Sequence, residues 1–313
     1  MNNGRRVAES GVFLGVFAIL LLISTYMPFL SIVSIFFLPV PFILISERNS
    51  KGWSLLFLLA ASLLTMIISN LMAMPLTIMF GLIGIVMGQY LQKDGSRLQM
   101  YIVASLICIF GFIFTYAGSI LLFDIDIFQD SLNLVNESLE QSAAVMEAMG
   151  QTDQMDTIKE SMAGMMETLQ QLLPSLFILS GLFVTGLIFL FNKPIINRFC
   201  RNKLMIGPVR NIQLPKSLLW YYLLTMIISL FVTVDADHFL FMAILNIMFC
   251  LQLFMLLQGI SLIFYFSHAK RWHKAVPVTI VVLSFIMPIL APFIRILGIM
   301  DLGFNLRDKI GPA

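Results

Sequence analysis

The sequence predicts an all-α polytopic membrane protein with about nine transmembrane helices. Of its 313 residues, 59% are hydrophobic and only 12% are charged, and the mean hydropathy is +0.94. A soluble domain has about 25% charged residues, so this chain has too few charges to cover a soluble globule. Its apolar residues also gather in runs of about twenty, the length at which a helix crosses the hydrocarbon core of a bilayer. A net charge of +2 gives no reason to expect a nucleic-acid partner, whereas membrane lipid is an expected one.

Nine apolar runs mark the expected spans, with eight or ten as alternatives. The runs cover residues 8–27, 29–46, 53–73, 75–91, 100–123, 172–192, 217–234, 239–267 and 276–299. The first run follows Arg5 and Arg6 as the core of a signal peptide would, but no cleavage site follows it, so we expect an uncleaved first helix. The second and fourth runs begin beside Pro28 and Pro75, because proline is well tolerated in the first turn of a helix.

Lys and Arg residues set the expected orientation, since the cytoplasmic loops of membrane proteins are enriched in both. With the N-terminus in the cytoplasm, 15 of the 19 Lys and Arg residues fall in cytoplasmic segments. The expected domains are spans one to five in 1–123, an outer hairpin in 124–171, span six in 172–192, a basic cytoplasmic loop in 193–216 and spans seven to nine in 217–313. Nine spans leave Arg307 and Lys309 outside, against the rule. Because Pro288 and Pro292 interrupt the last run, that run either crosses once or dips and lies along the interface.

The segment 124–171 is predicted to be an acidic helical hairpin on the outer face. It holds 10 of the chain's 17 acidic residues against the single base Lys159, which gives a net charge of −9. Two series of residues repeat with alternating spacings of four and three, as the a and d positions of a coiled coil do. The first series is Phe128, Leu132, Val135, Leu139, Ser142, Met146 and Met149, and the second is Met155, Ile158, Met162, Met165, Leu169 and Leu172. A turn at 150–153 separates them, so we expect two antiparallel arms.

No catalytic constellation is visible in the sequence, so we expect neither an enzyme nor a cofactor. The motifs of zinc proteases, serine hydrolases and P-loop ATPases are absent. Asp235, Asp237 and His238 stand together on the outer face as a candidate cation or interfacial enzyme site, but a short polar turn is the favoured interpretation. His268 and His273 are five residues apart and would point about 140° apart on a helix, so they do not chelate one metal.

Few polar residues interrupt the predicted spans. Glu9 is the one acid near the interior of a span, which argues against ion-coupled transport, since such transporters usually bury carboxylates. Arg295 either extends to the outer interface or acts as a counter-charge for an anionic ligand. Gln258, Ser261 and Tyr265 share one helix face, where they either hydrogen-bond to a neighbouring helix or line a polar cavity.

Small residues recur at spacings of three and four in two of the spans. The first span carries Ala8, Gly11 and Gly15, and the fourth carries Gly81, Gly84 and Gly88. Such stripes let another helix approach closely. We therefore expect helix docking at the first stripe and helix packing at the second.

Four stretches of the sequence together resemble the YybS-like family of uncharacterised bacterial membrane proteins. They are RRVAESGVFLG at 5–15, PVPFILISERNSKG at 39–52, GLIGIVMG at 81–88 and LGIMDLGFNLR at 297–307. The resemblance extends over essentially the whole chain.

The N-terminal part of that family is similar in turn to the S components of energy-coupling-factor transporters. S components are six-helix membrane proteins that capture a vitamin or metal from outside and dock on a transmembrane subunit energised by two cytoplasmic ATPases. The resemblance covers roughly residues 5–192 and implies docking through Ala8, Gly11 and Gly15. No pocket signature of S components is recognisable, so no substrate residue is carried over from them. If the protein is of this type, its pocket is expected to open outward near Tyr26, Asn70, Met72, Thr115, Tyr116 and Ser119, with Arg295 as a further candidate.

The outer hairpin and the last three spans have no counterpart in S components. They motivate an alternative, in which the protein is a non-enzymatic membrane scaffold or regulator. Its acidic hairpin would then bind an extracytoplasmic protein or a second copy of the chain, because complementary charge favours such association. The sequence thus predicts a cell-membrane protein that is either of S-component type or a scaffold.

Overall fold

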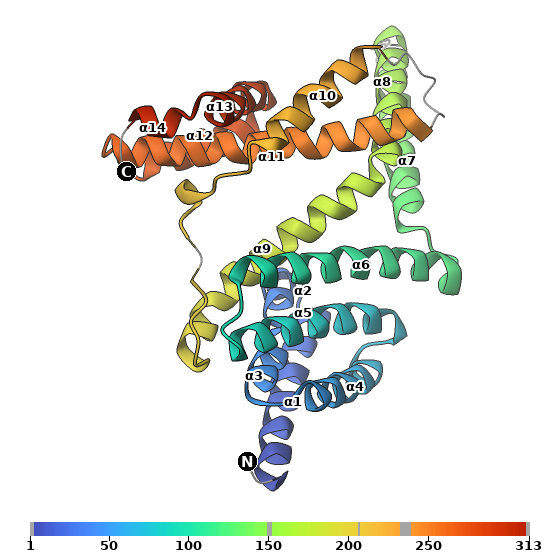
Figure 1. The fold of residues 1–313 in the computed structure, drawn as a ribbon. Helices are drawn as coiled ribbons and strands as arrows, with labels where there is room; N and C mark the ends of the chain where they lie inside the picture. Colours follow the sequence, from blue (N-terminus) through green and yellow to red (C-terminus); the bar gives the residue numbers. More distant parts are fainter. Residues whose placement is uncertain (1–2, 149–151, 206, 232–238, 311–313) are drawn as a thin grey trace. The chain divides into compact units, whose positions relative to one another are not determined.

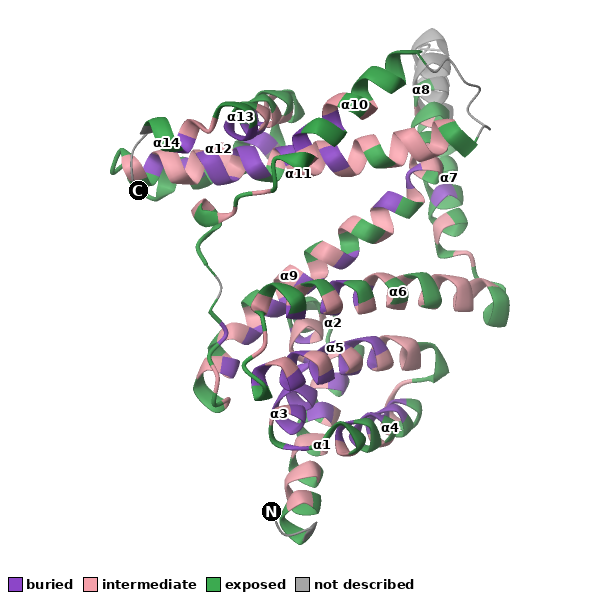
Figure 2. Cartoon of the chain, viewed as in Figure 1, coloured by how far each residue is buried: buried purple, intermediate pink, exposed green. Residues whose placement is uncertain are grey.

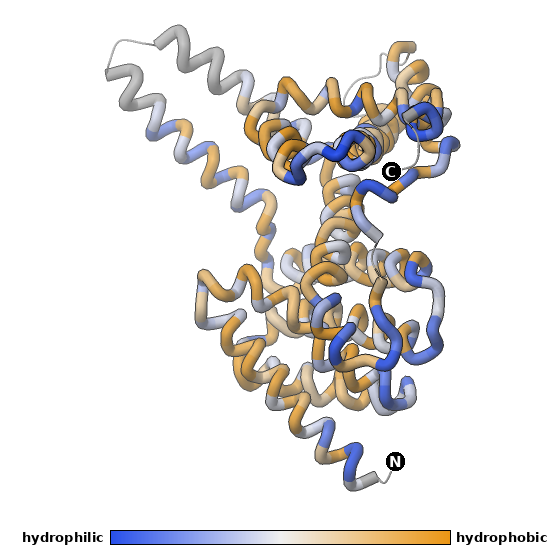
Figure 3. The backbone as a smooth tube through the Cα atoms, turned by 90° about the vertical axis from the view of Figure 1, so that its left-hand side faces the viewer, coloured by the Kyte–Doolittle hydropathy of each residue, from blue (hydrophilic) through white to orange (hydrophobic). Residues whose placement is uncertain are grey.

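The computed structural model describes residues 3–148, 152–205, 207–231 and 239–310 (Figure 1). Every regular element within these ranges is a helix, which confirms the predicted all-α class. Seven of the described helices are long and apolar enough to cross a membrane, or up to eight if one bent pair counts as a single span. Apolar residues follow the long helices and hydrophilic ones gather in the connections, as Figure 3 shows. The architecture is that of a polytopic membrane protein, but the expected count of nine spans is not confirmed.

The chain forms two compact units. The first unit comprises Met1–Ala163 and Phe177–Ile206, and the second comprises Gly164–Leu176 and Gly207–Ala313. The helices of the first unit are α1 (Asn3–Tyr26), α2 (Pro28–Ser34), η1 (Ile35–Phe37), α3 (Val40–Arg48), α4 (Lys51–Ile68), η2 (Leu71–Ala73), α5 (Met74–Gln92), α6 (Arg97–Phe123), α7 (Ile127–Ala148) and the larger part of α9 (Leu173–Phe199).

Prolines shape the second predicted span. Pro28 occupies the first turn of α2, and Pro75 does the same in α5, which confirms both predicted helix starts. The run 29–46, however, is not one straight helix. It divides into α2, η1 and α3, and the division falls at Pro39 and Pro41, because proline has no N–H to continue the backbone ladder.

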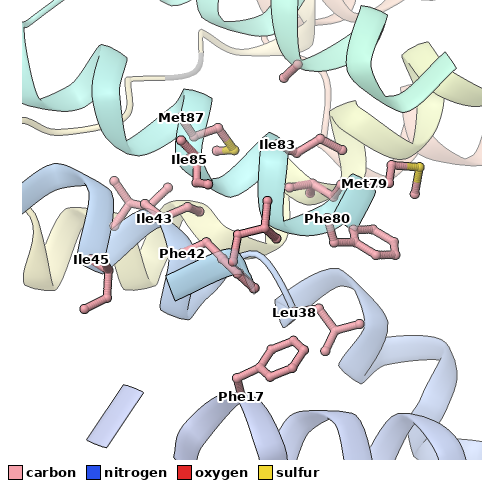
Figure 4. Packing of buried hydrophobic residues seen from close by; sticks show 14 of the residues in the cluster. Phe17, Leu38, Phe42, Ile43, Ile45, Met79, Phe80, Ile83, Ile85 and Met87 are labelled. Atoms are coloured by element: carbon pink, nitrogen blue, oxygen red, sulfur yellow. The ribbon is translucent and has the colours of Figure 1, made fainter. Parts of the chain in front are cut away.

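The core of the first unit surrounds α3. All residues from Val40 to Ser46 are buried, and the helix packs against α1, α4 and α5 (Figure 2). The ring of Phe42 meets the rings of Phe17 and Phe57 edge-on, at centroid distances of 5.4 and 5.2 Å. Figure 4 shows Phe42 and Ile43 beside the side chains of α5. Because α3 is buried on all sides, its sequence can be apolar throughout, without a polar face.

Glycines bring α5 against the backbone of α3. A Cβ atom on Gly84 would lie 2.7 Å from the carbonyl oxygen of Pro39, and one on Gly88 would lie 2.6 Å from that of Ile43. Either contact is too short for a real side chain, so only glycine allows this approach. Close backbone approach is a main source of helix association in membranes, since lipid tails are as apolar as the side chains that would replace them.

Buried amides complete the packing of the first unit. Gln89 donates to the carbonyl of Ser46 over 3.0 Å, and Asn192 of α9 donates to the carbonyl of Phe36 over 2.8 Å. Phe36 lies in η1, at the division of the second span. A side-chain donor from another helix thus satisfies part of the backbone where the helix is irregular, as a membrane interior requires.

The second unit contains α10 (Ser217–Phe231), α11 (Phe239–Ala269), α12 (Ala275–Ile286), η4 (Pro288–Leu290), α13 (Ala291–Phe304), α14 (Leu306–Ile310) and the single turn η3 (Val209–Asn211). The described part of the predicted seventh span, α10, has 15 residues. At 1.5 Å per residue it is about 22 Å long, shorter than a hydrocarbon core of about 30 Å.

The predicted ninth span is not a straight helix. Two segments, Ala275–Ser284 and Pro288–Phe304, meet at an angle of 109°. The bend falls at Pro288, which begins η4 and has no N–H for the preceding turn. The structure thus has a bent pair where the sequence left a choice between one crossing and a dip.

Glycines also join α11 and α13. A Cβ atom on Gly298 would overlap the carbonyl oxygen of Met255, and one on Gly259 would overlap that of Ile294. The two helices therefore cross with their backbones in contact. No sequence pattern reveals this pair, because its two glycines lie on different apolar runs and form no stripe.

Helices also occupy both arms of the predicted outer hairpin, α7 and α8 (Thr152–Gln171). Leu132 is buried, whereas Val135 and Met165, also assigned to the seam, are exposed. The turn residues 150 and 151 lie outside the described residues, as do Met149 and the side chains of Met146, Met155 and Ile158. The antiparallel pairing of the arms therefore stays a prediction.

Replacing Gly298 with Ala is expected to destabilise the second unit by about 1–3 kcal/mol, the usual cost of overpacking. The added methyl group can fit only if α13 moves away from Met255. Thermal unfolding of the purified protein in detergent measures the effect. Gly303→Ala is the matched control on the same helix, since its Cβ would lie 3.6 Å from the nearest atom. Equal melting temperatures for the two variants would contradict the close crossing.

Candidate functional site

A buried ion pair lies in the second unit. Asp301 of α13 is 1% exposed and Arg307 of α14 is 8% exposed, and Arg307 Nε lies 2.9 Å from Asp301 Oδ2. Gln258 Nε2 of α11 donates to the same carboxylate oxygen. We call Asp301, Arg307, Gln258 and Ser261 the Asp301 cluster. Burying such a pair is costly unless its remaining donors and acceptors are satisfied, so its surroundings decide what it does.

Local sequence brings Arg307 back to Asp301. Asn305 follows α13 in the left-handed conformation with φ of 49°, which Asn adopts more readily than most residues. The chain turns there and continues as α14. Arg307 is therefore placed against the end of α13 and the side of α11 instead of continuing away from them.

The other donors of Arg307 reach the basic loop 193–216. Its Nη1 donates to the carbonyl of Arg210 and its Nη2 to that of Ile212, both over 2.9 Å. Ser261 Oγ also donates to the carbonyl of Ile212, over 2.7 Å, and Gln258 accepts from the N–H of Leu214 over 3.0 Å. Three polar side chains thus hold the backbone of 209–214.

The arrangement explains why these polar residues lie in an apolar unit. Apart from η3, the stretch 208–214 is irregular and runs beside a long apolar helix. Backbone groups in such a position must be satisfied by protein, because hydrocarbon offers no partner. The Asp301 cluster supplies these partners, and its charges compensate each other. One atom, Asp301 Oδ1, is buried without a hydrogen-bond partner among the described residues.

The structure decides between the interpretations of the polar face on α11. Gln258 and Ser261 hydrogen-bond to the neighbouring segments, and Tyr265 lies under the guanidinium of Arg307, 5.3 Å from ring centroid to Cζ. The face therefore serves packing contacts. The expectation of Glu9 as the one acid near the interior of a span missed Asp301, which follows the predicted run 276–299 and is buried in α13. The sequence feature that could have revealed Asp301 is an acidic residue placed between apolar residues in 297–307.

Glu9 lies on α1, in the first unit. Arg48 Nη1 forms an ion pair with its carboxylate, and Arg48 also donates to the carbonyl of Phe199 over 3.4 Å. The pair connects α1, α3 and the end of α9. Both side chains are partly exposed. The ion pair therefore connects helices near the surface of the unit, and Glu9 is not a buried carboxylate.

The small residues of α1 present an open face. Ala8, Gly11 and Gly15 are exposed, and no atom comes within 4 Å of a Cβ built on Gly11 or Gly15. The glycines of α5, by contrast, are filled by α3 and α4. The stripe on α1 is therefore free of contacts with the described residues of this chain.

The residues expected to form an outward pocket fall into separate groups. Tyr26 donates to the carbonyl of Ile68 over 3.0 Å, Asn70 caps η2 by accepting from the N–H of Ala73, and Met72 is exposed. Tyr26 thus joins the end of α1 to the end of α4, and the side chain of Asn70 serves the backbone of η2.

The other expected pocket residues lie on α6. Thr115 and Ser119 donate to carbonyls one turn earlier on their own helix, and Tyr116 donates to Asp126 over 3.1 Å. No hydrogen bond among the described residues joins this group to Tyr26 or Asn70. Arg295 belongs to the second unit, where its Nε is buried and has no hydrogen-bond partner in the described ranges.

The described residues hold no group of three His, Cys, Asp or Glu side chains placed to bind a metal ion. Asp235, Asp237 and His238 lie outside the described residues.

Comparisons with known proteins agree with this architecture. A family model described as "Predicted membrane protein (DUF2232)" matches residues 15–302. An uncharacterised protein, YybS, of Bacillus subtilis (strain 168) is 27% identical over 310 residues, which covers 99% of this chain and 100% of the relative. No solved structure matches.

Asp301→Asn is expected to destabilise the protein by about 3–5 kcal/mol, because it leaves the guanidinium of Arg307 buried without a counter-charge. Arg307→Gln has the same effect from the other side. The double variant keeps no buried charge and should lose less than the sum of the two single changes. Thermal unfolding of all three variants in detergent measures this coupling. Strictly additive losses would show that the two charges do not stabilise each other.

The ion pair of Arg97 with Asp94 provides the control. Its N–O distance is also 2.9 Å, but Asp94 is exposed. Arg97→Gln is therefore expected to change stability by less than about 1 kcal/mol.

Proposed function

The chain belongs to the DUF2232 family of predicted membrane proteins, and on that premise we propose that it is a non-enzymatic docking module. Its first unit docks through α1 on a transmembrane helix of an energising subunit, as an S component does. The single observation that carries the proposal is the open stripe of Ala8, Gly11 and Gly15 on α1. The glycines of α5, by contrast, are all packed against α3 or α4.

The physics of helix association supports this role for the stripe. Two helices in lipid attach where small residues let their backbones meet. Within the first unit, α5 and α3 use that mechanism through Gly84 and Gly88. The stripe on α1 has the same spacing and an unfilled surface, so a helix of another protein can pack there in the same way.

The number of helices in the first unit also supports an S-component type of protein. Counting α2, η1 and α3 as one span, α1, the α2–α3 span, α4, α5, α6 and α9 make six candidate spans. The proposed partner is a transmembrane subunit driven by cytoplasmic ATPases. The cargo of the complex would be a small molecule captured from outside. The hydrogen bonds of Tyr26, Asn70 and Tyr116 are made within the protein, so none of the three is assigned to binding this cargo.

We assign no nucleophilic role to Cys200, which follows α9. Burial and the nearby carboxylate of Glu47 raise the pKa of the Cys200 thiol to about 11. Near neutral pH the group is therefore a thiol, and the thiolate is the nucleophilic form.

We also propose that residues 306–309 lie on the cytoplasmic side. Arg307 hydrogen-bonds to the backbone of the basic loop 193–216, which the positive-inside rule assigns to the cytoplasm. The bent pair α12–α13 then enters the membrane and returns, in place of a ninth crossing. This topology raises the cytoplasmic share of Lys and Arg from 15 to 17 of 19, by adding Arg307 and Lys309.

A second candidate function uses the acidic hairpin. Asp130, Glu137 and Glu140 on α7 are exposed, and they leave a strongly acidic surface for a basic partner. In this alternative the protein is a scaffold or regulator whose extracytoplasmic hairpin binds another protein of the envelope.

Gly11→Leu combined with Gly15→Leu is expected to lower co-purification of ATPase subunits from native membranes in mild detergent. A tenfold loss corresponds to about 1.4 kcal/mol of association energy, and two leucines on the contact face should cost at least that. Gly118→Leu on α6 is the matched control, since no atom lies within 4 Å of its Cβ either. Unchanged recovery with both glycines replaced would rule out this docking face. Partners lost instead on deletion of 128–168 would favour the scaffold.

Reporter fusions test the topology. Green fluorescent protein fused after residue 313 is expected to fluoresce, and alkaline phosphatase at the same point to be inactive, because the fusion point lies in the cytoplasm. Phosphatase fused after residue 148 is the outside reference. Active phosphatase fused at residue 313 would place the end of the chain outside and would favour a ninth crossing over the re-entrant pair.

A further inference from the structure

The second unit contains an apolar groove that the Asp301 cluster does not use. It measures about 410 Å³, within the range of about 300–1,000 Å³ typical of small-molecule sites. Leu262, Ile263 and Phe266 of α11 form one wall, and Ile280 of α12 and Leu297 of α13 contribute to the others. We call it the α11–α14 groove.

A turn at the end of α11 builds the remaining wall. Arg271 adopts the left-handed conformation with φ of 57°, and the N–H of Trp272 donates to the carbonyl of Ser267 over 2.8 Å. This is the Schellman pattern of helix ends, in which the residue after the turn folds back over the last helical turn. Trp272 accordingly meets Phe266 edge-on at 5.4 Å, and both line the groove.

Two lysines lie at this apolar space, and two further basic residues stand next to its Trp272 wall in the sequence. Lys309 lines the groove itself, and Lys270 Nζ lies 6.0 Å from the ring centroid of Phe266. Arg271 and Lys274 flank Trp272 in the sequence, and all four cationic side chains are exposed. In 267–274 and 306–309, Asp308 is the single acidic residue, and the guanidinium of Arg307 is occupied by Asp301.

We propose that the α11–α14 groove binds an acyl chain of an anionic phospholipid, whose phosphate lies among these cations. An apolar groove with cations at its side matches a ligand with an apolar chain and an anionic head. Basic pockets between transmembrane helices on the cytoplasmic side bind acidic lipid headgroups for the same reason. Ser267, which lines the groove, adds a buried hydroxyl without a hydrogen-bond partner among the described residues, a donor that a lipid ester can use.

Competition between two lipids that differ only in headgroup tests the proposal. The full chain is purified with equal amounts of dioleoyl phosphatidylglycerol and dioleoyl phosphatidylcholine, and native mass spectrometry counts the lipids retained. We expect phosphatidylglycerol to be retained preferentially. Lys270→Gln combined with Lys309→Gln should weaken its retention by about 25-fold, since each basic residue near a membrane surface contributes roughly fivefold.

The matched control removes the same charge elsewhere. Lys203→Gln combined with Lys216→Gln changes two exposed lysines of the basic loop 193–216 that do not line the groove. Phosphatidylglycerol retention should stay at the wild-type level in this variant. Equal retention of the two lipids by the wild type, or equal losses in both double variants, would overturn the proposal.

Fluorescence of Trp272 locates the lipid. A Trp53→Phe, Trp220→Phe variant keeps Trp272 as the only tryptophan of the chain, and lipids with brominated acyl chains quench a tryptophan that they touch. In nanodiscs of mixed composition, brominated phosphatidylglycerol should quench Trp272 more than brominated phosphatidylcholine at the same mole fraction. The Lys270→Gln, Lys309→Gln change should abolish that difference. Equal quenching by the two lipids in the parent variant would place the anionic lipid elsewhere and refute the site.

Discussion

Helices in this protein are held together by contact between their backbones. In lipid, an apolar side chain gains little by leaving the tails for another helix, so packing must come from a close approach. Gly84 and Gly88 permit that approach between α5 and α3, and Gly259 and Gly298 permit it between α11 and α13. Among the described residues each compact unit thus has at least one such crossing, and in the first unit Gly181 of α9 also comes close to the backbone of Ile109 on α6. The open stripe on α1 matters for the same reason, since it offers the same kind of surface with nothing yet in contact.

The second requirement of the membrane interior, that no backbone group be left without a partner, accounts for several of the buried polar residues. Asn192 serves the carbonyl of Phe36 where prolines divide the second span. Gln258, Ser261 and Arg307 do the same for the irregular stretch 209–214 on a larger scale. These residues would look like a binding site in a list of polar positions. Their hydrogen bonds go to backbone groups that have no partner within a helix. A ligand site is therefore to be sought at surfaces that make no such contacts within the protein.

Local patterns in the sequence predicted part of this structure. Pro28 and Pro75 predict helix starts, because the effect of a proline is confined to one turn. The hydropathy pattern predicts the long helices. The bend at Pro288 shows the limit, since a proline predicts an interruption but neither its direction nor the 109° angle. The pairing of Asp301 with Arg307 was missed because it depends on the reversal at Asn305 and on a loop almost a hundred residues earlier. The Gly259–Gly298 crossing was missed because its glycines belong to separate helices. The expected pocket residues were not brought together, because their hydrogen bonds go to separate neighbours: Tyr26 to Ile68, and Tyr116 to Asp126.

The Asp301 cluster bears on how the second unit is made in the cell. Its members lie on α11 and α13–α14 and they bond to the backbone of 209–214, so the contact joins three stretches of chain that leave the ribosome at different times. Apolar helices can enter the bilayer one by one before they pack, but a carboxylate and a guanidinium are costly there until they meet. The two charges are therefore compensated only once Asp301 and Arg307 have met. Before that contact forms, Gln258 and Ser261 of α11 also lack the hydrogen-bond partners that the folded unit gives them.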